Sequence, residues 1–337
     1  MSGKRSSIKQ VSRRGFLAGA AATVAGSSAS LGAGDETNQP PADATPKLPM
    51  RPLGQTGVKV SILGLGGGGR GGNPQIRGTP QHPEIQEQAE QILNRALDAG
   101  VNYIDTCAGY GESERIIGNV AATRRKEMFL ATKCDRCNAS GDQLRKELEQ
   151  SLQRLQTDTI DLWQVHNIVN LRHVDTIFEE GRAIDVLFKA KEERIARFVG
   201  ITVHASRAVI EATFERCRQR GIAMDALLMA FNVADASKGG YGRKVLDAHP
   251  SIGKIAMKVF ASDGAPIVHH EGIPARAALR YVLSHGFATA IVGTHNLEEL
   301  EENIETVRGF EPYSEEELRE LEGRVGRSGG GLWTLQG

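Results

Sequence analysis

Short apolar runs recur along the chain from Met50 onward, and polar segments with a longer period separate them. Each run is short and largely unbroken, which is typical of parallel strands that are buried on both faces. The pattern predicts strands at residues 62–65, 103–106, 128–133, 162–166, 198–202, 226–231, 255–260 and 289–293.

The segments between these runs have the period of amphipathic helices. Two of them carry an apolar stripe, the first through Ile85, Ala89, Ile92, Leu93, Ala96 and Leu97 and the second through Leu144, Leu148, Leu152 and Leu155. Glycine favours helix ends, and it stands where three of the helices should stop, at positions 100, 221 and 286. Strands that alternate with helices in this way predict an α/β fold, a (β/α)8 TIM barrel.

Two further elements extend the predicted barrel. A Gly-Gln-Thr-Gly turn between extended pieces predicts an N-terminal hairpin over 50–61, and the charged stretch 315–322 predicts an extra C-terminal helix. The competing architecture is a doubly wound sheet, whose first strand is followed by a glycine-rich turn that leads straight into a helix. The glycines within 64–72 run instead into a long polar loop before Pro83, which favours the barrel and indicates a flexible substrate loop.

The first fifty residues have the pattern of an export signal. A basic start leads to Arg13 and Arg14, and Gly-Phe-Leu and an uncharged stretch rich in Ala and Gly follow. The paired arginines resemble the twin-arginine motif, whose route carries folded proteins, whereas the apolar part is too short for a stable membrane span of about 20 residues. We therefore expect a periplasmic or otherwise exported protein, with the export machinery as a partner. The expected segments are a signal peptide at 1–34, a linker at 35–49, the barrel at 50–326 and a tail at 327–337.

Composition narrows the function. The 41 basic and 41 acidic residues give a formal net charge of zero, so there is no global basic field to attract nucleic acid. Cys134 and Cys137 form a lone C-x-x-C without a second ligand pair, so we expect incidental cysteines, although an exported chain could join them in a disulfide. The sequence His269-His270-Glu271 lacks the helical H-E-x-x-H spacing, so no metal site is predicted.

Polar residues close three successive predicted strands, and in barrels of this type the chemistry gathers at the carboxyl ends of the strands. Asp105 follows strand two, Lys133 closes strand three and His166 closes strand four. Tyr110 lies five residues after Asp105. A lysine cation near a phenol favours the phenolate, which makes Tyr110 a usable proton donor to a developing alkoxide. His166 could donate a hydrogen bond to the same oxygen.

These residues carry a resemblance to a known family. The run Asn102-Tyr103-Ile104-Asp105-Thr106 with Tyr110-Gly111, the run Ala131-Thr132-Lys133 and the run 161–166 are similar to motifs of the aldo/keto reductases. The helical stretch 148–155 resembles a further motif of that family, and the likeness extends from about Arg51 to Arg324. The resemblance implies the tetrad Asp105, Tyr110, Lys133 and His166, with Tyr110 as general acid/base and a nicotinamide across the barrel mouth.

The segment after strand eight resembles the family's site for the adenosine phosphate of the cofactor, where Gly293, Thr294, Glu302 and Asn303 fit the pattern. Members that prefer NADP(H) usually carry basic or amide residues where this chain has His295 and Glu299. A carboxylate repels a 2′-phosphate but can accept a hydrogen bond from a 2′-hydroxyl. Both NAD(H) and NADP(H) stay open, and the electrostatics favour NAD(H).

Other positions depart from the family. In the family a Ser-Asn pair often holds the nicotinamide amide. Thr202 retains the hydroxyl of that serine, but Val203 cannot replace the amide of the asparagine. Leu228 stands where a Gln often holds the same group, although Asn232 follows. Lys258 stands about where an aromatic ring often stacks on the nicotinamide. We expect an oxidoreductase that moves a hydride between the cofactor and a carbonyl or alcohol of an aldehyde, ketone or sugar. The alternative is a divergent, catalytically weak barrel that binds a ligand or partner.

Overall fold

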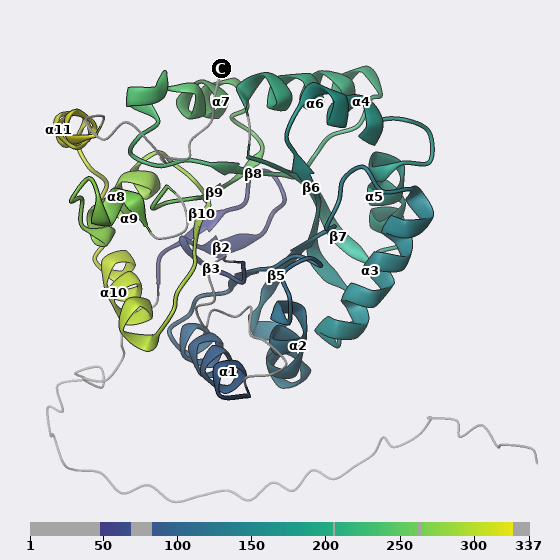
Figure 1. Cartoon of the computed structure of the whole chain (residues 1–337), viewed down its shortest axis with the longest axis horizontal. Coiled ribbons are helices and arrows are strands. Elements are labelled where there is room, and N and C mark those ends of the chain that lie inside the picture. The colour runs from purple at the N-terminus through teal and green to yellow at the C-terminus, as the bar shows by residue number, and fades with distance from the viewer. Residues whose placement is uncertain (1–47, 69–82, 205, 262–264, 326–337) are drawn as a thin grey trace, which may run out of the picture. The chain divides into compact units, whose positions relative to one another are not determined.

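The structure, a computed structural model, describes residues 48–68, 83–204, 206–261 and 265–325. Parallel strands pair in a closed ring in the order β10-β3-β4-β5-β6-β7-β8-β9, which confirms the predicted barrel (Figure 1). Their bounds are β3 (Leu63–Gly66), β4 (Tyr103–Asp105), β5 (Phe129–Lys133), β6 (Ile160–Ile168), β7 (Ala196–Val203), β8 (Ala226–Ala230), β9 (Gly253–Met257) and β10 (Thr289–Val292).

Side chains alternate between two apolar layers along the barrel strands. One cluster fills the inside of the barrel and includes Tyr103, Phe129 and Leu162. The other lies between the strands and the surrounding helices and includes Trp163 and Val203. Because successive residues of a strand point to opposite faces, parity decides which residues can reach the interior and its mouth.

Helices follow the strands and cover the barrel from outside (Figure 1). Several begin with a side chain that accepts a hydrogen bond from a free backbone N–H of the first turn, as Ser140 does in the capping box of α3. The helices are α1 (Pro83–Asp98), α2 (Ser113–Arg124), α3 (Gly141–Leu155), α4 (Leu171–Ile177), α5 (Ala183–Glu192), α6 (Arg207–Gln219), α7 (Tyr241–Ala248), α8 (Pro266–His269), α9 (Ala275–Ser284), α10 (Leu297–Arg308) and α11 (Glu315–Arg324), with 3-10 turns at Arg125–Glu127 and Ala236–Lys238.

The predicted hairpin is present as β1 (Met50–Pro52) and β2 (Lys59–Ser61), which pair antiparallel. Leu53 and Val60 of the hairpin are fully buried and belong to the inner cluster of the barrel. Gly54 packs against the start of β9 so closely that a Cβ there would lie 2.3 Å from the backbone nitrogen of Gly253. The hairpin therefore closes the barrel at the amino-terminal ends of its strands.

One strand is longer than its apolar run predicts. β6 begins before Leu162 because Asp161, although polar, is buried at the strand start and accepts a hydrogen bond of 2.9 Å from the backbone N–H of Leu130. Arg125 and Arg197 form ion pairs with the same carboxylate. A charged residue can therefore begin a buried strand when arginines neutralise it.

Several predictions concern segments outside the described residues. The predicted signal peptide, the linker apart from Leu48 and Pro49, the C-terminal tail and the glycines at 69–72 all lie there, so their predicted boundaries and roles stay predictions. Where the chain is described, no helix combines the length and apolarity needed to cross a membrane.

Candidate active site

Four polar side chains meet at the carboxyl ends of neighbouring strands. Asp105 ends β4, Lys133 ends β5, and His166 lies near the end of β6. Tyr110 lies in the turn between β4 and α2. Since β4, β5 and β6 are consecutive in the ring, the barrel brings the predicted tetrad together.

Asp105 and Lys133 form a buried ion pair, with Nζ of Lys133 2.5 Å from an Asp105 carboxylate oxygen. Nζ also donates to the carbonyl oxygen of Thr106 at 2.7 Å. Burial by itself lowers the pKa of Lys133, but the interactions with Asp105, Tyr110 and Cys107 outweigh it, so the net pKa is raised. Burial raises the pKa of Asp105, and Lys133 offsets only part of that rise. The two groups hold each other in the charged form against the cost of desolvation.

The Tyr110 ring lies beside this pair, with Nζ of Lys133 5.2 Å from the ring centre. Gly68, just after β3, also packs closely against this ring, because a Cβ there would lie 2.4 Å from Cε2 of Tyr110. Gly67 donates its N–H to the Asp105 carbonyl at 2.7 Å. Gly68 therefore allows close packing around the tyrosine, whereas Gly67 allows close packing against Ser113 and Asp105.

His166 stands edge-on to Tyr110, with ring centres 6.2 Å apart and planes at 83°. Burial, and then the positive charge of Lys133, lowers the pKa of His166 to about 3. The ring is therefore neutral at physiological pH. Its Nδ1 faces Sγ of Cys107 at 3.5 Å.

His204 joins this group although the sequence did not single it out. It follows β7, and its ring centre lies 5.7 Å from that of His166. Burial first, and then the charges of Lys258 and Lys133, lowers the pKa of His204 to about 3. We call His166 and His204 the mouth histidines. The sequence could have indicated His204, because it lies two residues after Thr202 and its side chain is therefore expected on the same side of the strand.

Gln164 was also missed in the sequence. It is fully buried on β6, in the inward register of His166, and accepts a hydrogen bond from Oγ1 of Thr202 at 3.4 Å. Within the described residues its Nε2 has no hydrogen-bond partner. A buried amide donor without a partner is costly, so this group is available to a bound ligand or water.

The departures from the family pattern separate into different groups. Val203 belongs to the outer layer, so a side chain at this position packs against the helices. Leu228 belongs to the inner cluster. Asn232, just after β8, donates to the carbonyl of Lys258 at 3.0 Å and accepts from the N–H of Ala234 at 3.0 Å, so its amide holds two loops together.

The predicted cofactor segment follows β10 and leads into α10. Gly293 and Thr294 precede the helix, and Thr294 is buried. Glu299 accepts hydrogen bonds from both the backbone N–H and Nδ1 of His295, each at 2.9 Å, so the carboxylate is held at the start of α10. Asn303 is buried on the same helix, whereas Glu302 is exposed.

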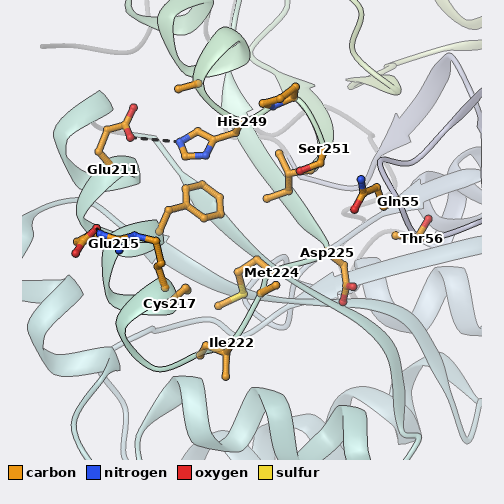
Figure 2. A pocket seen from close by; sticks show the side chains of 16 residues that line it. Gln55, Thr56, Glu211, Glu215, Cys217, Ile222, Met224, Asp225, His249 and Ser251 are labelled. Carbon is orange, nitrogen blue, oxygen red and sulfur yellow. Dashed lines mark hydrogen bonds and ion pairs between the residues drawn. The ribbon is translucent and has the colours of Figure 1, made fainter.

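Other candidate features stand apart from these residues. All four cysteines are free thiols, so the structure holds no disulfide between Cys134 and Cys137. In the part of the chain that is described, no group of three or more His, Cys, Asp or Glu side chains is arranged to hold a metal ion. A cavity of about 750 Å³ lies beside the residues that precede β8 and β9, where His249 pairs with Glu211 (Figure 2). It is therefore at the end of the barrel opposite the tetrad.

Known proteins share parts of this sequence and the fold. The chain is 33% identical over 165 residues to L-galactose dehydrogenase of Arabidopsis thaliana, a match that covers 46% of this chain and 49% of that protein. It is 33% identical over 152 residues to 6-dehydroglucose reductase of Novosphingobium aromaticivorans, which covers 40% of this chain and 46% of that protein. The chain thus spans about half the length of these curated relatives.

The fold comparison covers more of the chain. The holo form of an aldo-keto reductase from Bacillus halodurans has a TM-score of 0.66 and 21% identity, over 83% of this chain and 97% of that one. At this identity the likeness shows the shared barrel alone. The sequence model described as the Aldo/keto reductase family matches residues 63–264, which is more than half of the 337 residues. The chain belongs to the aldo/keto reductase family.

Proposed function

We propose that this chain is an oxidoreductase that moves a hydride between a nicotinamide cofactor and a carbonyl or alcohol group of a small substrate. The observation that carries the proposal is the position of the Lys133 cation, 2.5 Å from the Asp105 carboxylate and 5.2 Å from the centre of the Tyr110 ring. The attraction between the Lys133 cation and the Tyr110 oxygen favours the phenolate form of Tyr110. Tyr110 can therefore give its proton to a developing alkoxide and take it back in the reverse reaction.

The other polar residues at the carboxyl ends of the strands have separate roles in the proposed reaction. Asp105 keeps Lys133 charged and fixed, and the neutral His166 ring can donate a hydrogen bond that orients the reacting oxygen. A bound nicotinamide would supply or accept the hydride. The unpaired amide donor of Gln164 and the nearby Thr202 hydroxyl offer the polar groups that a carboxamide requires.

The Tyr110→Phe variant tests the proposal because it removes the proton donor and preserves the ring. We expect at least about a hundredfold loss of kcat/KM for carbonyl reduction, in the range of general acid catalysis. Tyr313→Phe is the matched control: Tyr313 also carries a cation over its ring, with Arg280 3.9 Å from its centre, but it follows α10 far from the tetrad. Undiminished reduction by Tyr110→Phe would refute Tyr110 as the proton donor. A wild-type chain that neither binds NAD(H) or NADP(H) nor reduces carbonyls would favour the alternative of a binding barrel.

The proposed substrate is a small carbonyl or alcohol compound of the sugar class. The support is the activity for which two relatives are named, one a dehydrogenase of L-galactose and the other a reductase of 6-dehydroglucose. A panel of aldoses, sugar lactones and simple aldehydes at equal concentration tests this class. Turnover confined to simple aldehydes would contradict it.

The proposed cofactor is NAD(H) rather than NADP(H). Glu299 supports it, because its carboxylate is held by His295 at the start of α10, where a 2′-phosphate would meet a negative charge. Binding titrations should show that NADH binds more tightly than NADPH. Glu299→Gln should reduce the ratio of the NADPH dissociation constant to the NADH dissociation constant by about threefold to tenfold. Glu298→Gln, one residue earlier and exposed, is the control. Release of NADP(H) from the denatured purified protein, identified by mass spectrometry, would contradict the preference.

The proposed location is the periplasm, with the twin-arginine machinery as the export partner. The support is the sequence alone, namely the pair Arg13 and Arg14 before an uncharged Ala/Gly-rich stretch. Replacing both arginines by lysine should keep the protein in the cytoplasmic fraction, whereas Lys9→Ala should not. Export that survives the double replacement would refute the route.

A further inference from the structure

The mouth of the barrel contains a thiol that the proposed reaction does not use. Cys107 lies two residues after Asp105 and is 1% exposed. Burial raises its pKa to about 12, so it is a thiol and not a thiolate at physiological pH. A buried thiol of this kind is a weak hydrogen-bond donor rather than a nucleophile or metal ligand.

A neutral histidine has one N–H, and its position decides what the ring can do. His166 can donate to a substrate oxygen at the mouth through Nε2 only if Nδ1 is unprotonated. Nδ1 points at Sγ of Cys107, 3.5 Å away. The thiol therefore contacts the nitrogen whose protonation selects the tautomer.

The backbone of His166 is held by a second thiol, so the ring is the part left for Cys107 to fix. The N–H of His166 donates to Sγ of Cys134 at 3.2 Å, and Sγ of Cys134 donates to the His166 carbonyl at 3.3 Å. The thiol of Cys107 has two acceptors within reach, Nδ1 of His166 and the carbonyl of Cys134, each at 3.5 Å. If the thiol donates to Nδ1, that nitrogen is unprotonated and the proton of the neutral ring lies on Nε2.

We propose that Cys107 is a positioning residue that donates its S–H to Nδ1 of His166 and thereby fixes the tautomer that carries its proton on Nε2. The inference rests on the proposed function, in which His166 donates a hydrogen bond to the reacting oxygen. Cys107 touches neither substrate nor cofactor in this arrangement. It acts through the histidine.

Nitrogen NMR of the full chain with ¹⁵N-labelled histidine reads the tautomer directly, without cofactor or turnover. The His166→Gln spectrum identifies the His166 signals by their loss. We expect wild-type His166 to show an unprotonated Nδ1 and a protonated Nε2. Cys107→Ala should shift this pattern toward a mixture, and Cys107→Ser, whose hydroxyl can also donate, should restore it. Cys217→Ala is the matched control, since Cys217 is also buried but lies on α6 beside the cavity at the other end of the barrel.

Kinetics provide an independent readout. Cys107→Ala should lower kcat about tenfold with little change in KM, because a buried nitrogen loses its partner while substrate contacts remain. Cys107→Ser should recover most of the loss. A wild-type His166 protonated on Nδ1, or an unchanged His166 pattern in Cys107→Ala, would overturn the inference even if the enzyme is active. The expected NMR pattern in a protein without reductase activity would support the role of Cys107 and reject the proposed function.

Discussion

Replacing Lys133 by methionine removes the cation from a carboxylate that has almost no access to water. The side chains of Lys133 and Asp105 are 1% and 5% exposed, and their atoms are 2.5 Å apart. Removing one partner of a buried pair costs about 3–5 kcal/mol, because the other charge stays buried without compensation. The carbonyl of Thr106 also loses its donor, which adds about 1 kcal/mol. The expected loss is a large share of the 5–15 kcal/mol that holds a typical domain folded.

The double variant Asp105→Asn/Lys133→Met separates this reasoning from simple loss of packing. It removes both charges, so it should be less destabilised than Lys133→Met alone, by at least about 2 kcal/mol. The partly exposed pair of Lys191 and Asp225, also 2.5 Å apart, gives a control, and Lys191→Met should cost about 1 kcal/mol or less. Urea unfolding followed by circular dichroism at pH 7 measures all four chains.

The change of stability with pH tests whether the unpaired Asp105 carboxylate causes the loss. Without Lys133, burial alone acts on Asp105 and holds its pKa above the unfolded value of about 3.9. The folded variant then binds the proton more tightly than the unfolded chain, so its stability rises as the pH falls toward that value. The gap between the single and double variants should therefore shrink as the pH falls from 7 toward the unfolded value of about 3.9. A gap that is absent, or that does not change with pH, would refute the argument.

Three further predictions follow from buried groups and tight backbone. The pKa of folded His204 is about 3, so the folded chain stays unprotonated there while the unfolded chain binds a proton below about pH 6.5. The free energy of unfolding should therefore decrease as the pH is lowered from about 6.5 toward 3. His204→Gln should reduce that slope by about 1.4 kcal/mol per pH unit in urea unfolding. Gly68→Ala should displace the Tyr110 ring and lower kcat at least about tenfold with little change in Tm, and an unchanged kcat would contradict the packing argument. Gly54→Ala should cost at least about 2 kcal/mol more than Gly57→Ala, because both have positive φ but only the first meets backbone; equal losses in Tm would count against it.

The barrel, and the meeting of Asp105, Tyr110, Lys133 and His166 at one end of it, could be predicted because both leave strong local signals. Buried parallel strands are continuous apolar runs, and a charged residue at the end of such a run, as at Lys133, is expensive unless it is paired or used. The start of β6 could not be predicted in this way, because Asp161 is neutralised by arginines from other segments.

The rest of the mouth depends on which way side chains point. At Val203 the sequence shows that an amide is absent, and parity along β7 places the side chain in the outer layer, where it packs with the helices. Gln164 shares the inward register of His166 and was overlooked because a single glutamine in an apolar strand carries no motif. Cys107 gave no signal in the sequence, since its importance depends on a nitrogen from a strand two places away in the ring.

The ring of strands closes where β10 pairs with β3, with Ala290 opposite Leu63. The two partners are far apart in the chain, so during synthesis the first barrel strand has no neighbour on one side until the last has left the ribosome. At about 5–20 residues per second this interval is on the order of 10 to 45 s. The exposed edge of β3 is a site for pairing with other chains during that time. A chaperone that binds the nascent chain until β10 emerges would therefore shield this edge.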